Sequence, residues 1–502
     1  MSEQYASLSG GSATEIAASV ERAVASGELP PGARLPAVRA LASSLGVSPT
    51  TVAAALSELR RRGVVVSRPR SGTRISERPP LRASAPATVV HGTRDLALGN
   101  PDPSLLPDLT AAFQAELEET RRGATAPGGA VAAGGETAPD RATAPGDEFA
   151  FGAAAAGDET ASGGAATPGS ATAPGGTAAP RASWQRLYGE SPIDPGLATV
   201  ARAALEADGI AAERLVVVNG ALDGIERALA AHLVPGDQVA VEDPGWPGVL
   251  DLARALGLRL APVAVDERGM LPDALEAALR GGARAALVTP RGHNPLGAAF
   301  DAERAAALRE LLADVLVIED DHLGPVAGVP WHSVAGRSGR WATVRSVSKW
   351  LGPDLRCAVL AGDALTLARV EGRMSLGPGW VSSILQRLTA RLWADPEVEA
   401  LVEQASAVYA SRRAAMVDAL AAHGLRAFAP SGLNVWIPVP DEDTAVRALL
   451  AAGVSVAAGA PFRLEAPPAI RITVAALRHD EAPALATALA AAVNPPHRTR
   501  AG

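Results

Sequence analysis

The chain has 502 residues, of which 48% are hydrophobic, and a formal net charge of −8 at pH 7. This length exceeds what one hydrophobic core supports, so two or three domains are expected. No charge-free apolar run reaches 18 residues, and the amino-terminus lacks a signal-peptide pattern. The single cysteine, Cys357, excludes an intrachain disulfide and a cysteine-built metal site. We therefore expect a cytoplasmic protein without a membrane segment or a metal.

Basic residues gather near the amino-terminal end. Seven arginines lie between Arg60 and Arg78, where Glu77 is the only acid. The acidic average of the whole chain therefore conceals a positive region. Such an asymmetry favours a polyanionic partner such as double-stranded DNA. A solvated basic surface with no ligand is the alternative.

Helical periodicity predicts three helices in this region. The first covers residues 14–26, and the second covers about 38–45. Gly46 then forms a turn, and Ser48-Pro49 has the N-cap and first-turn proline that begin a third helix. Two helices joined by so short a turn form a helix-turn-helix, with the third helix placed for the major groove of DNA.

Alternating residues at 64–67 and 73–76 predict a two-stranded wing after the third helix. The segment over about residues 14–76 resembles the winged-helix DNA-binding domain of the GntR family. The motifs that carry this resemblance are Leu29-Pro30-Pro31-Gly32-Ala33-Arg34-Leu35-Pro36, Leu45-Gly46-Val47-Ser48, Thr50-Thr51-Val52 and Arg70-Ser71-Gly72-Thr73.

The resemblance implies which residues contact DNA. By position these are Arg39, Ser48, Thr50, Thr51 and Gly72. Pro49 stands where many members have a base-reading arginine, and Ala53 replaces another polar residue. Fewer direct base contacts are therefore expected, and the operator sequence cannot be inferred.

Two irregular tracts divide the remaining chain. After a DNA-binding domain at residues 1–76, a linker rich in proline and alanine covers 77–94. Residues 95–502 are expected to form one further domain, interrupted at 123–180 by repeated alanine, glycine, threonine and proline. This segment has few large apolar residues, and burying them cannot offset the entropy lost when the chain is ordered. Residues 123–180 are therefore interpreted as a disordered insertion. A long insertion adds little to the entropy of loop closure.

Short apolar runs alternate with alanine-rich helical stretches in the large part of this domain. This alternation predicts an α/β fold with a mainly parallel seven-stranded sheet and helices on both faces. Ligand-binding residues are then expected at the carboxyl ends of the strands. The seven runs are 215–218, 238–241, 259–265, 285–288, 315–318, 344–347 and 358–361.

Polar motifs follow several of these strands. Gly220, Ala221 and Leu222 open a helix after the first run, and backbone N–H groups at such a start can bind a phosphate. Trp246 follows the second run, where an indole can stack on a planar ring or simply pack in the core.

The stretch from Ser346 to Arg356 contains Lys349, the only lysine among 46 lysine and arginine residues. An amine, unlike a guanidinium, can form a Schiff base with a carbonyl compound. Ser346, Ser348 and Arg356 can hold a phosphate, the arginine through two parallel hydrogen bonds. Pyridoxal phosphate carries both a carbonyl and a phosphate, so it matches this set of residues. The alternative is that Lys349 is an ordinary lysine in a surface loop and binds no ligand.

The Ser-x-Ser-Lys segment and the later arginine resemble the cofactor-lysine segment of fold-type I aminotransferases. In that family an asparagine, here Asn294, donates to the cofactor phenolate oxygen, and an aspartate, here Asp320 rather than Asp321, pairs with the ring nitrogen. His322 replaces a tyrosine that binds the phenolate oxygen, and an imidazole can donate the same bond. The resemblance also assigns a phosphate contact across a dimer interface to Tyr188.

The last part of the chain, about residues 365–502, has the mixed strands and helix of the family's small domain. Strands are expected at 434–438, 454–456 and 470–474 around a helix near 444–452. By resemblance, Arg471 binds the substrate carboxylate; an arginine in an exposed strand would need no ligand.

A winged helix followed by an aminotransferase-like domain resembles the MocR-type regulators of the GntR family. This resemblance implies a homodimeric regulator that binds DNA and senses pyridoxal phosphate, or an amine or amino acid that reacts with it. A working aminotransferase with a fused DNA-binding domain is the alternative, with Lys349 and Asp320 as catalytic residues. A third hypothesis is an inactive domain that only dimerises.

Overall fold

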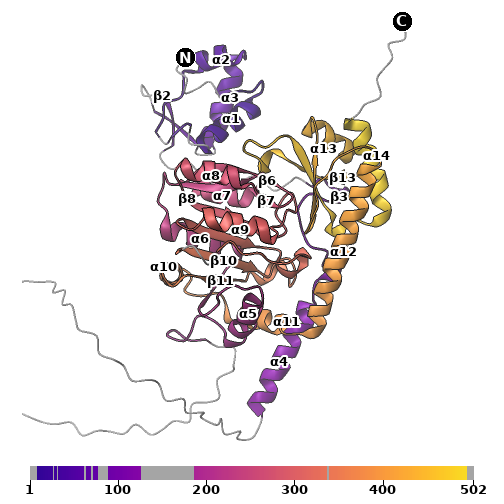
Figure 1. The fold of residues 1–502 in the computed structure, drawn as a ribbon. Helices are drawn as coiled ribbons and strands as arrows, with labels where there is room; N and C mark the ends of the chain where they lie inside the picture. Colours follow the sequence, from indigo (N-terminus) through magenta and orange to yellow (C-terminus); the bar gives the residue numbers. More distant parts are fainter. Residues whose placement is uncertain are drawn as a thin grey trace, which may run out of the picture. The chain divides into compact units, whose positions relative to one another are not determined.

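The computed structural model describes residues 8–25, 28–30, 32–61, 64–68, 72–76, 89–125, 186–335 and 339–493 (Figure 1). Residues 126–185 lie outside the described part, so most of the insertion predicted at 123–180 is not described. Its first residues, 123–125, form the end of helix α4 (Leu109–Thr125). Most of the predicted linker, residues 77–88, lies outside the described part as well.

The amino-terminal segment forms the predicted winged helix-turn-helix. Its core consists of apolar residues from all three helices, including Ile16, Leu41 and Leu59. Ser48 caps the third helix by accepting a hydrogen bond from Thr51 N, at 3.1 Å. The elements are α1 (Ala13–Ala25), α2 (Val38–Leu45), α3 (Pro49–Arg61), β1 (Val65–Arg68) and β2 (Gly72–Ile75), with β1 and β2 antiparallel.

An eight-stranded sheet is the centre of the aminotransferase-like domain. Its strand order is β4-β11-β10-β9-β8-β5-β6-β7. All seven predicted strands are present. The eighth strand, β7, lies at the edge of the sheet and has two residues, which is too short to give an apolar pattern. The bounds are β4 (Leu215–Val218), β5 (Gln238–Asp243), β6 (Arg259–Asp266), β7 (Gly269–Met270), β8 (Ala283–Val288), β9 (Leu316–Asp321), β10 (Trp341–Ser346) and β11 (Ala358–Gly362).

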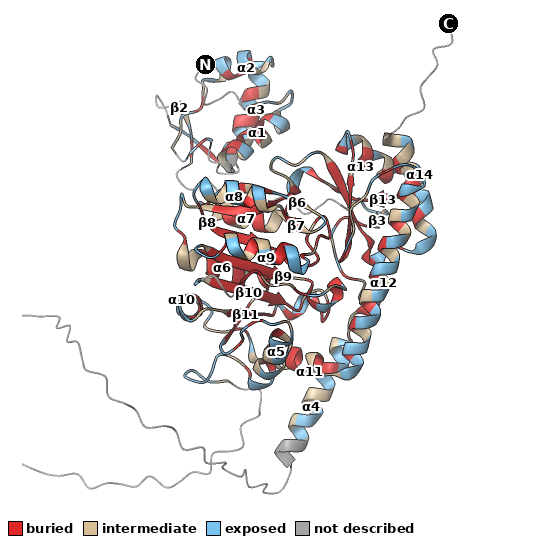
Figure 2. Ribbon diagram, in the orientation of Figure 1, coloured by how far each residue is buried: buried red, intermediate tan, exposed pale blue. Residues whose placement is uncertain are grey.

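The sheet is mainly parallel, and its strands are buried on both faces (Figure 2). Successive residues of a strand point to opposite faces, so alternate residues enter two separate hydrophobic cores. One core includes α6 (Ala221–His232), α7 (Pro247–Ala255) and α10 (Ala364–Ser375). The other includes α5 (Pro195–Ala207), α8 (Pro272–Arg280), α9 (Ala302–Leu311) and α11 (Ser383–Trp393). β11 alone runs antiparallel to both of its neighbours.

A third core belongs to the smaller α+β portion. Its strands are β12 (Asn434–Pro438), β15 (Ala469–Thr473) and β14 (Ala457–Ala458), with β13 (Val454–Ser455) nearby, and its helices are α12 (Pro396–Ala421), α13 (Glu442–Ala451) and α14 (Ala482–Val493). β13 pairs in parallel with β3 (Arg94–Asp95), which begins at the last residue of the predicted linker, 77–94. The segment after the linker therefore completes the small portion, an association that no local pattern indicates.

The remaining helices are short or border the gap. They are α4 (Leu109–Thr125) and the 3₁₀ helices at Pro103–Leu105, Gly324–Ala327, Pro353–Leu355, Ala460–Phe462, Val474–Ala476 and His479–Glu481. Within the described ranges no single helix has the length and hydropathy to cross a membrane. The pair α2 and α3 reaches that length and hydropathy only when taken together, across a bend of 115°.

Candidate functional site

A small hollow opens at the carboxyl ends of β5, β8 and β9. Four predicted residues line it, together with Glu242 and Thr289, which the sequence did not single out. The four predicted residues are Trp246, Asn294, Asp320 and His322.

The structure separates the two adjacent aspartates at the end of β9. Asp320 lines the hollow, and its Oδ1 atom is buried with no hydrogen-bond partner among the described residues. Asp321 belongs to a different polar cluster. Neighbouring residues of a strand face opposite sides, which is why only one of the two carboxylates enters the hollow. This arrangement supports Asp320 as the partner of a ring nitrogen.

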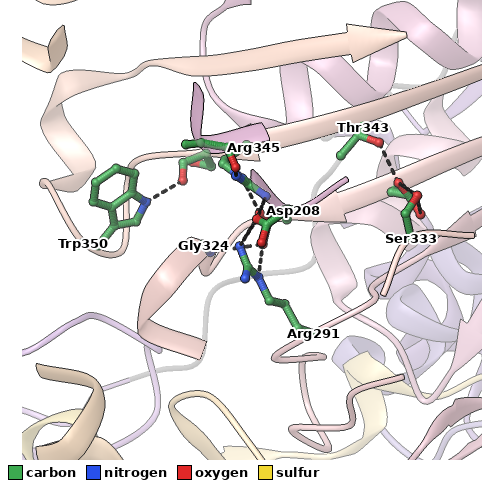
Figure 3. Close-up of polar contacts among 11 residues, drawn as sticks. Asp208, Arg291, Gly324, Ser333, Thr343, Arg345 and Trp350 are labelled. Atoms are coloured by element: carbon green, nitrogen blue, oxygen red, sulfur yellow. Dashed lines mark hydrogen bonds and ion pairs between the residues drawn. The ribbon is translucent and has the colours of Figure 1, made fainter. Parts of the chain in front are cut away.

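Asp321 is fully buried between two arginines. Arg291 binds it through two parallel hydrogen bonds, both of 2.9 Å, and Arg345 Nε donates to Asp321 Oδ2 at 2.6 Å. Both arginines also approach Asp208, as Figure 3 shows, at 3.6 Å and 2.5 Å. Burial would raise the pKa of the Asp321 carboxyl, but the two guanidinium groups outweigh that effect and hold the pKa below its usual value.

Trp246 and His322 both line the hollow. Their ring centroids are 6.3 Å apart, and the ring planes differ by 24°. This separation lies within the roughly 4.5–7 Å between the centroids of interacting aromatic rings. The indole of Trp246 is thus placed at the hollow, where the sequence predicts that it stacks on a planar ring.

Glu242 and His293 add two buried ionisable groups beside Asp320. Glu242 accepts hydrogen bonds from Thr289 N and Thr289 Oγ1, at 3.2 and 2.7 Å, and lies 3.5 Å from His293 Nε2. Burial raises the pKa of Glu242 to about 8 and lowers the pKa of His293 to about 3. Glu242 directly follows the predicted strand at 238–241 and lies four residues before Trp246. This position is the one sequence signal that could have identified it.

The predicted phosphate-binding residues meet at the neighbouring strand ends. Ser346 lies opposite Ala358, and Ala358 lies opposite Val218, so β10 and β4 end at the same edge of the sheet. Arg356 Nη2 donates to Asn219 O at 2.9 Å.

The Arg356 guanidinium lies directly over Gly220, where an added Cβ would be 2.7 Å from Nη2. Gly220 precedes the first turn of α6, with Ala221 and Leu222, and offers no side-chain cap. The free N–H groups of that turn can therefore face a phosphate. Ser346 Oγ donates to Ser348 Oγ at 3.1 Å, which brings both hydroxyls to this edge.

Lys349 and Arg471 both bind the chain segment at residues 97–99. Lys349 Nζ donates to Gly99 O at 2.8 Å, and Arg471 Nη2 donates to Ala97 O. Burial, with a smaller effect from the nearby Arg471, lowers the pKa of Lys349 to about 8. A larger fraction of the amine is therefore neutral near physiological pH than in an exposed lysine.

Arg471 is connected to the hollow through Asn294. Its Nη1 atom donates to Asn294 Oδ1 at 3.0 Å, and its guanidinium lies 4.8 Å from the centre of the Phe462 ring. The Nε atom is buried and has no hydrogen-bond partner within the described part of the chain. A buried guanidinium with one unsatisfied nitrogen is suited to a carboxylate ligand.

Tyr188 lies apart from these residues. It is 93% exposed, and its ring contacts only the edge of Trp380 among the aromatic contacts described, at 5.4 Å between centroids. A single chain thus leaves this side chain uncovered, and its predicted contact with a partner subunit stays a prediction.

The residues predicted to contact DNA are mostly exposed. Arg39 lies on the surface of α2, and the hydroxyl groups of Thr50 and Thr51 both lie 2.7 Å from Ser48 Oγ at the start of α3. Gly72 begins the second wing strand with φ +77°, a conformation that favours glycine. These positions remain predicted contacts.

The chemistry of this site fits pyridoxal phosphate. An indole at the hollow, an unpaired buried carboxylate oxygen, a phosphate cradle without a capping side chain and a lone lysine occur together. When bound, this cofactor supplies an electrophilic ring that withdraws electrons from an attached amine. The fold and site define a protein with a DNA-binding winged helix and a pyridoxal-phosphate-binding, aminotransferase-like domain.

Comparison with known proteins identifies the family. Residues 12–75 match the family described as bacterial regulatory proteins, gntR family, and residues 197–489 match aminotransferase class I and II. The chain is 36% identical over 497 residues to the vitamin B6 salvage pathway transcriptional repressor PtsJ of Salmonella typhimurium, covering 97% of this chain and 100% of that protein. The chain belongs to the MocR-type regulators of the GntR family, which combine these two domains.

Two further comparisons agree with this assignment. The HTH-type pyridoxine biosynthesis transcriptional regulator PdxR of Corynebacterium glutamicum is 25% identical over 424 residues, covering 81% of this chain and 78% of that protein. The kynurenine aminotransferase of Pyrococcus horikoshii has the same fold, with a TM-score of 0.63 at 19% identity over 80% of this chain and 91% of that one.

Proposed function

We propose that this protein is a cytoplasmic, homodimeric transcription regulator that senses pyridoxal phosphate, or an amine or amino acid that reacts with the bound cofactor. The names of PtsJ and PdxR both refer to vitamin B6 metabolism, which supports the cofactor itself as effector. The observation that carries the proposal is the hydrogen bond from Lys349 Nζ to Gly99 O.

This bond connects the site to the chain that leads to the DNA-binding domain. Gly99 lies a few residues after β3, and β3 begins where the predicted linker ends. Lys349 cannot both donate to Gly99 O as an ammonium and hold a cofactor aldehyde covalently. Arg471 donates to Ala97 O through Nη2, and its Nε is a buried donor still available to a carboxylate.

Attachment of the cofactor to Lys349 therefore changes the anchoring of residues 97–99 at Gly99 O. A ligand shifts an equilibrium only when it binds two arrangements differently, and this hydrogen bond is a contact that differs between the free and occupied site. We expect this difference to alter how firmly the segment after the linker is held, and hence the affinity for DNA.

DNA binding to the region upstream of the protein's own gene tests the proposal. Affinity should be measured at a stated salt concentration, with and without pyridoxal phosphate, for wild type, Lys349→Ala and Lys349→Arg. We expect the cofactor to change the affinity of the wild type only. Lys349→Arg is the matched variant, because it keeps a cation that can donate to Gly99 O but cannot form the covalent bond.

A full response in both variants would show that covalent attachment is not what the protein senses. A wild type that remains colourless after incubation with pyridoxal phosphate would contradict cofactor binding itself. An unchanged effector response in Lys349→Ala would instead favour the hypothesis of a domain that only dimerises.

The working aminotransferase remains a second candidate because Lys349, Asp320 and Arg471 belong to one continuous site. Lys349 has a lowered pKa suited to proton transfer, and Arg471 is available for a substrate carboxylate. Single-turnover reactions with a panel of amino acids distinguish the two functions, since an enzyme releases a keto acid and a sensor does not.

A further inference from the structure

Asp243 binds a loop of the smaller portion through three backbone N–H groups. Its Oδ1 atom accepts from Leu464 N at 2.8 Å. Its Oδ2 atom accepts from Glu465 N at 2.7 Å and from Ala466 N at 2.9 Å. The Asp243 side chain is buried at the end of β5, and hydrogen bonds to a carboxylate are about twice as strong as those between neutral groups. This carboxylate therefore holds the backbone of the loop in place.

The loop connects β14 to β15 and is held on two sides. From the end of β5, Gly245 N donates to Phe462 O at 2.7 Å. On the other side, Glu442 in the first turn of α13 accepts from Ala460 N at 2.8 Å and from Ala469 N at 3.1 Å. The end of β5 thus fixes the middle of the loop, while α13 fixes both of its ends.

Phe462 brings this loop to Arg471. The centre of its ring lies 4.8 Å from the guanidinium carbon of Arg471, and the ring also contacts Trp436, at 5.9 Å between centroids. Phe462 and Arg471 are both buried, and burial lowers the pKa of Arg471 to about 10. A cation in such a site attracts a carboxylate more strongly than a solvated cation does, because the effective dielectric constant is lower.

We propose that Asp243 is a positioning residue for the carboxylate of an amino-acid ligand. It fixes the loop so that Phe462 shields the Arg471 guanidinium from water. This inference rests on the proposed function, because it requires an amino acid at the cofactor with its carboxylate at Arg471. The buried Nε atom of Arg471 is the donor left for that carboxylate.

Two probes that differ only in a carboxylate test this role. ʟ-Alanine and ethylamine have the same primary amine on the same two-carbon chain, and only ʟ-alanine has the carboxylate. Binding of each probe to the full-length protein loaded with pyridoxal phosphate is measured by the absorbance of the cofactor. The ratio of the two affinities isolates the carboxylate site, because a general change in folding or in Lys349 affects both probes alike.

The preference for ʟ-alanine should fall when the loop is released. Asp243→Asn keeps the shape of the side chain, but its NH₂ group faces backbone N–H groups, so the three hydrogen bonds cannot all form. We expect the affinity ratio to fall at least about 10-fold, because water then raises the effective dielectric constant around Arg471. Glu465→Gln is the matched control and should keep the wild-type ratio, because its side chain is exposed in the same loop.

Phe462→Leu tests the ring itself, since this variant keeps the backbone hydrogen bonds of the loop. Its affinity ratio should also fall, because leucine covers less of the guanidinium than a phenyl ring does. In Arg471→Gln the preference should be lost, and the addition of Asp243→Asn should lower the ratio no further, since both changes act through the same guanidinium.

A wild-type ratio in either Asp243→Asn or Phe462→Leu would overturn the inference. So would a further fall in the double variant, because Asp243 would then act by a route other than Arg471. If the wild type binds both probes equally well, the amino-acid ligand of the proposed function is contradicted, and this inference with it.

Discussion

At the scale of single residues, the site combines groups whose protonation is set by burial. Burial disfavours the charged form of both Lys349 and Glu242. It lowers the pKa of Lys349 to about 8 and raises the pKa of Glu242 to about 8. The lysine is therefore a better nucleophile near pH 7 than an exposed lysine. At pH 7 about one amine in ten is neutral with a pKa of 8, compared with roughly one in three thousand at 10.5.

The rate at which Lys349 binds the cofactor aldehyde should follow this pKa. We expect the rate, measured by the growth of visible absorbance, to rise with pH to a midpoint near 8. In Arg471→Gln the midpoint should move upward, since removal of a neighbouring cation favours the charged amine. A midpoint above pH 10 in wild type, or a downward shift in the variant, would contradict this assignment.

Asp321 should contribute to stability rather than to ligand binding. Removing the charge between Arg291 and Arg345 leaves two buried cations incompletely paired, and such changes cost about 3–5 kcal/mol. We expect Asp321→Asn to lose a free energy of unfolding of this size at pH 7, measured by urea denaturation. Asp480→Asn, which alters an exposed ion pair with Arg478, is the control and should cause little change.

The same substitution should alter the response to acid. Because the folded pKa of Asp321 is lowered, its contribution is fully present above the unfolded pKa of about 4 and is lost as pH falls further. Wild type should therefore lose stability more steeply than Asp321→Asn below pH 4. Parallel curves for the two proteins would contradict the ion-pair interpretation.

At the scale of secondary-structure elements, α6 connects the phosphate cradle to the sheet. Gly224 lies where α6 packs on the strands, and an added Cβ would be 3.0 Å from Val344 Cγ1 and 3.1 Å from Val218 Cγ2. The helix can lie this close only because residue 224 has no side chain. Its position also sets where the first-turn N–H groups lie relative to Arg356.

Gly224→Ala should therefore weaken both stability and cofactor binding. Overpacking of this kind costs about 1–3 kcal/mol, and a displaced α6 would move its N–H groups away from the cradle. Gly372→Ala is the matched control, because Gly372 lies in α10 and an added Cβ there meets nothing within 4 Å. The control should gain up to about 1 kcal/mol. Unchanged cofactor affinity in Gly224→Ala would show that α6 does not position the phosphate.

At the scale of the whole molecule, the proposed dimer can be tested through Tyr188. If Tyr188 reaches the site of the partner subunit, each complete site uses residues from two chains. Tyr188→Phe should then weaken cofactor binding without affecting folding, because the side chain is 93% exposed in a single chain.

Mixing two variants that are each impaired in cofactor binding gives the sharper test. In a heterodimer of Lys349→Ala and Tyr188→Phe, one site would combine an intact Lys349 with an intact Tyr188 from the partner. We expect mixing to restore one site of wild-type affinity per heterodimer, measured by cofactor absorbance. No restoration in verified heterodimers would show that Tyr188 does not act across an interface.

The sequence by itself determined the family and the order of elements and predicted the residues of the candidate site, because these depend on local patterns. Strand-helix alternation predicted the seven main strands, and short motifs at strand ends identified residues such as Lys349, Arg356 and Asn294. Parallel strands place their carboxyl ends at one edge, so residues far apart in sequence could be assigned to one site before its geometry was known.

Only the tertiary structure decided which atoms meet. The pairing of β3 with β13, the bond from Lys349 to residue 99 and the placement of Glu242 all join segments distant in the chain. The pleat of the strand places Asp320 and Asp321 on opposite faces of the sheet but does not say which face binds a ligand. The arginines around Asp321 decide this, because they leave only Asp320 for a ligand. Local sequence patterns carry backbone preference and hydrophobic period, whereas these contacts depend on how the completed sheet and its loops bring distant side chains together.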